Sequence, residues 1–60
     1  MEISRKFFSQ GGLYTSIAHL PNSEYELALT GPKGVYIIGN FRTRKRVIEE
    51  ERELRRIVWG

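Results

Sequence analysis

Residues 24–43 of the chain read EYELALTGPKGVYIIGNFRT, and most of the predicted architecture follows from this stretch. Polar and apolar residues alternate over 24–30, which is typical of a strand with one face in water. Residues 31–34 (GPKG) predict a short link, because proline presets φ and glycine tolerates positive φ. Residues 35–39 are β-branched or aromatic up to a glycine and predict the next strand.

A strand before this stretch and a helix after it complete the prediction. Residues 13–20 are rich in aromatic and β-branched residues and end at the turn-forming residues 21–23, so they predict the first strand. After residue 40 the chain becomes charged and helix-favouring, with Thr43 as the expected N-cap. Apolar residues recur there at helical spacing, although Glu51 stands where an apolar residue is expected.

The predicted fold class is α+β: a three-stranded antiparallel β-meander packed against one C-terminal α-helix, in the order β-β-β-α. Links this short cannot carry a parallel crossover, so neighbouring strands run in opposite directions. One sheet face should meet the apolar stripe of the helix. The residues expected on that face are Tyr25, Leu27 and Leu29.

The chain is expected to form one small domain over residues 1–60. The sheet is predicted over 13–39 and the helix over 43–58. Residues 1–12 are predicted to be an N-terminal arm, in which the apolar side chains fit either a helical turn or a strand. Those apolar side chains are Ile3, Phe7 and Phe8.

Length and composition limit the classes of function. A chain of 60 residues buries only ~60% of the surface that its unfolded form exposes, so one thin core is all it can form. It has no cysteine, no aspartate and a single histidine, His19, and so offers few nucleophiles, bases or metal ligands. We therefore expect no enzymatic activity, no cofactor and no metal site. With no bilayer-length apolar run and no secretory signal, the sequence predicts a cytoplasmic protein that does not contact membranes.

The net charge of +3 comes from the last third of the chain. Up to residue 41, three basic side chains balance three acidic ones, whereas residues 42–60 carry seven basic and four acidic side chains. Four of the basic residues surround the predicted helix start: Arg42, Arg44, Lys45 and Arg46. Cations there oppose the positive end of the helix dipole, so folding alone favours acids. They are candidates for contacts with a phosphate backbone, or they pair with glutamates one turn further on and form a solvated face.

The outer sheet face is the second candidate site, because two strands can enter the major groove of DNA. The side chains predicted to contact DNA from it are Tyr14, Ser16, Thr30 and Tyr36, with Lys33 in the connecting turn. Glu24 and Glu26 would repel phosphates on that face and favour a protein contact or an ordinary hydrated surface. Trp59 is expected to cover the core or to anchor a protein interface.

Residues 36–43, YIIGNFRT, lead into the charged helix, and this passage resembles the small DNA-binding domains of phage and transposon integrases and of AP2-type plant factors. Those domains also pass from a third strand through a glycine, an aromatic and a threonine into the helix. The resemblance implies a sheet laid into the major groove, with Lys33 and the cations of 42–46 on phosphates. The first two predicted strands depart from it, because they carry two glutamates and no arginine.

Two functions are therefore predicted. The first choice is a small DNA-binding protein that regulates transcription, of the kind that phages or plasmids encode, with double-stranded DNA as its partner. The alternative is a protein-binding regulator or inhibitor of a host enzyme. Its interface would comprise Glu24, Glu26, Trp59 and an unpaired edge strand. Self-association as a homodimer is compatible with both functions.

Overall fold

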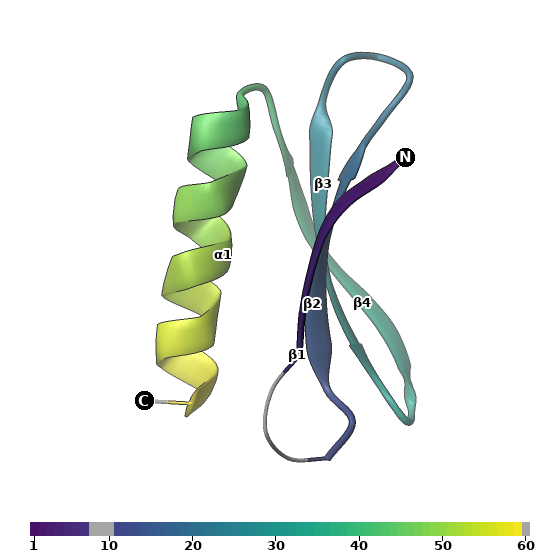
Figure 1. The fold of residues 1–60 in the computed structure, drawn as a ribbon, viewed down its shortest axis with the longest axis vertical. Helices are drawn as coiled ribbons and strands as arrows, with labels where there is room; N and C mark the ends of the chain where they lie inside the picture. Colours follow the sequence, from purple (N-terminus) through teal and green to yellow (C-terminus); the bar gives the residue numbers. More distant parts are fainter. Residues whose placement is uncertain (8–10, 60) are drawn as a thin grey trace.

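The computed structural model describes residues 1–7 and 11–59, and of Phe7 and Trp59 it describes the backbone only. The elements in this part of the chain are β1 (Glu2–Phe7), β2 (Tyr14–His19), β3 (Tyr25–Gly31), β4 (Gly34–Phe41) and α1 (Arg44–Trp59). The strands form an antiparallel meander in the order β1-β2-β3-β4, and α1 lies along one face of it (Figure 1). The predicted α+β class, the meander and the C-terminal helix are confirmed.

The predicted number of three strands is wrong, because residues 2–7 form a fourth strand instead of an arm. β1 pairs with β2 so that Ser4 lies opposite Ile17 and Lys6 lies opposite Thr15. Two backbone hydrogen bonds tie its start to β2: the His19 amide donates to the Met1 carbonyl at 2.6 Å, and the Met1 amino group donates to the His19 carbonyl at 2.8 Å. Phe8 lies outside the described residues.

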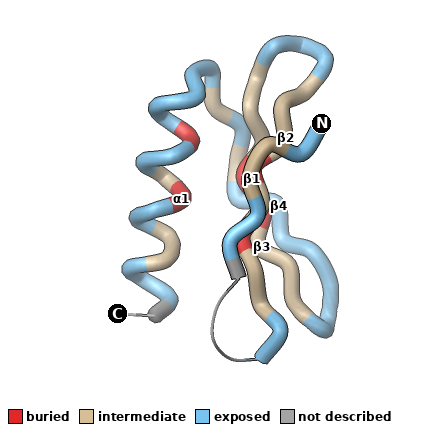
Figure 2. The backbone as a smooth tube through the Cα atoms, in the orientation of Figure 1, coloured by how far each residue is buried: buried red, intermediate tan, exposed pale blue. Residues whose placement is uncertain are grey.

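A thin core lies between the sheet and the helix. Ile17 of β2, Leu27 of β3 and Val47 of α1 form its buried centre, and each is at most 1% exposed. Figure 2 shows the buried positions on the facing sides of the sheet and α1. Four partly buried residues pack around that centre: Ile3, Tyr25, Phe41 and Leu54. The prediction that Tyr25, Leu27 and Leu29 face the helix is confirmed, because they lie opposite the helix-facing residues of β2.

The start of α1 is fixed by Thr43, as the sequence predicts. The Thr43 Oγ1 accepts a hydrogen bond from the Arg46 amide at 3.1 Å, which satisfies one of the free donors of the first turn. The Thr43 carbonyl accepts the first helical bond from the Val47 amide at 3.2 Å. From this cap the helix runs back along the sheet and contacts mainly β3 and β4.

Glu51 occupies the apolar stripe of α1 because β2 provides a partner for it. The Thr15 hydroxyl donates to Glu51 Oε2 at 2.7 Å, and the two residues are only 1% and 3% exposed. The Arg55 Nε lies 3.7 Å from the same carboxylate oxygen. A satisfied polar contact thus replaces the apolar contact expected at this position and joins α1 to β2.

Candidate functional site

The strand register separates the side chains that the sequence placed on one DNA-reading face. Residues directly opposite each other on neighbouring strands share a face. Tyr14 lies opposite Thr30 and Ser16 opposite Ala28, on the face away from the helix. Tyr36 lies opposite Leu29, which shares the helix-facing side with Leu27. Tyr14 and Ser16 are therefore brought together, and Tyr36 is not.

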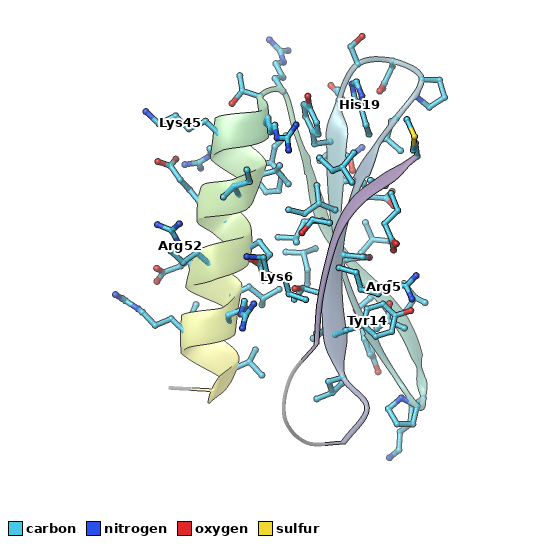
Figure 3. All side chains as sticks on the ribbon, in the orientation of Figure 1. Arg5, Lys6, Tyr14, His19, Lys45 and Arg52 are labelled. Atoms are coloured by element: carbon cyan, nitrogen blue, oxygen red, sulfur yellow. The ribbon has the colours of Figure 1, made fainter. Side chains whose placement is uncertain are left out.

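The outer face also carries an arginine that the sequence interpretation missed. Arg5 lies opposite Ser16, and its guanidinium carbon is 4.7 Å from the centre of the Tyr14 ring (Figure 3). Its Nη2 is 2.9 Å from Glu2 Oε1, and this hydrogen-bonded carboxylate raises the pKa of Arg5. Both contacts hold the guanidinium against its own sheet. Treating residues 1–12 as an arm hid the Arg5–Tyr14 contact, because these two residues meet only when β1 pairs with β2.

The basic cluster, defined as Arg42, Arg44, Lys45 and Arg46, is spread around the first turn of α1. Successive helical residues are about 100° apart around the axis, so its three helical members point in different directions. Lys45 points away from the sheet (Figure 3). Arg44 lines a pocket between α1 and β1. The Arg46 Nη2 lies 3.4 Å from Glu50 Oε2, and its guanidinium is 6.0 Å from the centre of the Phe41 ring.

Three members of the basic cluster keep their charge available for a partner. Among the described residues, no carboxylate oxygen lies within 4.0 Å of Arg42, Arg44 or Lys45. Lys33 is exposed in the β3–β4 turn, at the opposite end of β4 from Arg42. The cations predicted to contact phosphates therefore occupy two ends of the molecule.

The two glutamates predicted at a protein interface occupy different positions. Glu24 belongs to the turn before β3, where its amide donates to Asn22 Oδ1 at 3.1 Å. Glu26 lies on the outer face of β3, opposite Ala18 on one side and Asn40 on the other. The predicted role of the Trp59 side chain lies outside the described residues.

His19 has a neighbour of its own on the helix-facing side of the sheet. It lies opposite Tyr25, and the two rings are stacked with their centres 4.6 Å apart and their planes 9° apart. In the described ranges, no three His, Cys, Asp or Glu side chains group together in a way that could hold a metal ion. His19 thus packs as a cross-strand aromatic pair.

Among the side chains that the structure describes, the longest run of exposed apolar residues lies on β4 and was missed by the sequence interpretation. Val35, Tyr36, Ile37 and Ile38, here called the β4 apolar patch, are 44–61% exposed. β4 is an edge strand, since β3 is its only neighbour in the described sheet. Isolated exposed apolar residues are common, but several in succession on an edge strand favour pairing with a further strand. The β-branched residues that identified the strand were the available signal.

Two further features shape the β4 apolar patch. Leu27 lies opposite Gly39 while Ala28 lies opposite Ile37, so Ile38 is an extra residue that forms a β-bulge. An open, mainly apolar pocket adjoins the patch at the β3–β4 turn and is lined by Gly11, Leu13, Gly31, Pro32, Lys33 and Tyr36. The exposed apolar surface therefore extends from β4 to the β3–β4 turn and the residues before β2.

Comparisons of the chain with models of known protein families, with curated proteins and with solved structures gave no match. No helix in the described part of the chain is long and apolar enough to cross a membrane. The surfaces of the molecule itself are therefore the basis for any functional proposal.

Proposed function

We propose that this protein is a binding module that takes up an extended segment of another protein alongside β4. The observation that carries the proposal is the β4 apolar patch, four consecutive side chains that are 44–61% exposed on an edge strand. The free edge of such a strand presents N–H and C=O groups that pair readily with an added strand. Main-chain hydrogen bonds then provide affinity, and the exposed side chains provide specificity.

The contrast between the two sheet edges supports this choice. β1, the other edge, carries the charged residues Glu2, Arg5 and Lys6, which discourage pairing with a further strand. β4 has eight residues and no charged side chain. The charged side chains that protect β1 against strand addition are therefore absent from β4, in which the bulge at Ile38 is the one irregularity of the pairing.

Selection of random 12-residue peptides against the folded protein tests this function, with affinities measured by fluorescence anisotropy. We expect the selected peptides to be rich in apolar and β-branched residues. Ile37→Lys should lower the affinity of these peptides roughly tenfold or more, because it places a charge in a desolvated contact. Ile57→Lys is the matched control, since Ile57 is also exposed but lies on α1. Circular dichroism checks that both variants fold. Equal binding by the two variants, or no selected peptide at all, would contradict strand addition at β4.

A second candidate function is phosphate-directed DNA binding through the helix start. It is favoured by the three members of the basic cluster without a carboxylate partner and by the absence of acidic residues from the first turn of α1. The sheet has no part in this proposal, because the register separates Tyr36 from Tyr14 and Ser16. Sequence-independent binding that depends strongly on salt is the expected behaviour.

Anisotropy titrations of fluorescent duplex DNA at 50 and 200 mM NaCl test this second function. Three phosphate contacts predict a log-log slope of about −2.7, so the affinity should fall about fortyfold between the two salt concentrations. Arg42→Gln or Lys45→Gln should each reduce the slope by about one. The control is Arg46→Gln, because Glu50 already pairs with Arg46. Absence of binding at 50 mM NaCl would rule this function out.

A further inference from the structure

We infer that the segment bound at β4 is an apolar stretch of another protein with an acidic residue at each end, and that it is not a second copy of this chain. The inference rests on the proposed strand addition at β4 and identifies the chemistry of its partner. Three features carry it: the cations that flank β4, the faces of its side chains and the register that self-pairing would require.

The free edge of β4 has one exposed cation beyond each end. Lys33 precedes the strand and Arg42 follows it, and both are exposed. A strand of eight residues spans about 26 Å, so the two charges lie well apart and act separately. Neither has a carboxylate oxygen within 4.0 Å among the described residues. An added strand would meet a positive charge at each end and apolar side chains between them.

The exposed side chains of β4 lie on both faces of the sheet. Val35 and Ile37 lie opposite Thr30 and Ala28 on the outer face. Tyr36 lies opposite Leu29 on the helix-facing side. A strand that pairs with this edge has apolar neighbours above and below the sheet. The matching segment is therefore continuously apolar rather than apolar at alternate positions.

Pairing of β4 with a second copy of itself would bring like charges together. Full-length antiparallel pairing that keeps each side chain on its own face sets Gly34 opposite Phe41 of the second copy. Lys33 is then directly opposite Arg42 of the second copy, at both ends of the interface, and like charges in that position are destabilising. A shift by one residue sets outer side chains against helix-facing ones. A shift by two residues still leaves the cations within about two residues of each other.

Acidic residues at both ends of the added strand remove this conflict. Carboxylates opposite Lys33 and Arg42 form cross-strand pairs of opposite charge, which stabilise the pairing and help to set its register. Because both cations are exposed, added salt should screen the preference.

Fluorescence anisotropy with defined peptides tests the inference. The probe is a capped ten-residue peptide with glutamate at both ends and eight valine and alanine residues between them, and two matched peptides carry glutamine or lysine at the ends. At 20 mM NaCl the glutamate peptide should bind roughly tenfold more tightly than the glutamine peptide, and the lysine peptide should bind most weakly. Lys33→Gln and Arg42→Gln should each remove about threefold of that preference. Arg52→Gln, which removes an exposed cation of α1 outside the basic cluster, should leave that preference unchanged.

The outcomes separate this inference from the proposed function. Equal affinity for the glutamate and glutamine peptides would overturn the inference that the bound segment has acidic ends, and would leave the proposal of strand addition in place. Failure of all three peptides, together with an unsuccessful peptide selection, would overturn both. Analytical ultracentrifugation provides the remaining outcome: a dimer at 10 μM that Ile37→Lys dissociates would make a second copy the occupant of this edge and overturn the inference.

Discussion

Leu27→Ala should leave much of the protein unfolded at 25 °C. Leu27 of β3 is 0% exposed and belongs to the core cluster with Ile17 of β2 and Val47 of α1. Truncation of a buried leucine costs about 2–5 kcal/mol, because the transfer free energy is lost and a cavity remains. A core of this size supplies only about 3–5 kcal/mol of net stability, and no disulfide adds to it. One truncation therefore removes most of the free energy of unfolding.

Urea denaturation followed by circular dichroism measures this loss, and the same strand provides a matched control. Leu29 lies on the helix-facing side of β3 but is partly exposed and outside the core cluster. Leu29→Ala should therefore cost less than half as much as Leu27→Ala. Equally small losses in the free energy of unfolding for the two variants would contradict the packing of α1 against Leu27 at the centre of β3.

Thr15→Val should cost about 1–3 kcal/mol although it leaves the volume of the side chain nearly unchanged. The substitution removes the hydroxyl that donates to Glu51 Oε2 at 2.7 Å. The Glu51 carboxylate then remains buried without that donor, and a buried polar group with a lost partner retains its full desolvation penalty. Thr15→Ser keeps the hydroxyl and should restore most of the stability.

A double-mutant cycle tests whether the loss arises from the unpaired carboxylate. Combining Thr15→Val with Glu51→Leu replaces both partners by apolar groups, which is often neutral or stabilising relative to the intact pair. We expect the double variant to be more stable than Thr15→Val alone in the same urea titration. Additive losses from the two substitutions would mean that Thr15 and Glu51 do not interact.

The local signals of the sequence were sufficient for the meander and the helix. Alternation over 24–30, the glycine–proline link and Thr43 as N-cap all act between near neighbours, and these elements form where they predict. β1 gave no such signal, because its six residues include three charged ones and a bulge interrupts its pairing between Glu2 and Ser4. Its strand character depends on β2 beside it.

The sequence did not reveal on which sheet face each candidate side chain of β4 lies, because this depends on the length of the turn between β3 and β4. Gly31 pairs with Gly34, so only Pro32 and Lys33 form the turn, and Tyr36 falls opposite Leu29. Recognition of this two-residue turn would have placed Tyr36 on the same face as Leu29. The Thr15–Glu51 contact joins residues 36 positions apart, and no periodic pattern in the helix could reveal it.

The meander order of the sheet also bears on how the chain reaches its native state. Every strand pairs with its immediate neighbour along the sequence, so each hairpin closes across a short loop. Short closures lose little chain entropy before contacts form, and folds dominated by local pairing reach the native state quickly. A folding chain would therefore spend little time with several unpaired strands exposed at once. This limits aggregation through the free edge of β4 before folding is complete.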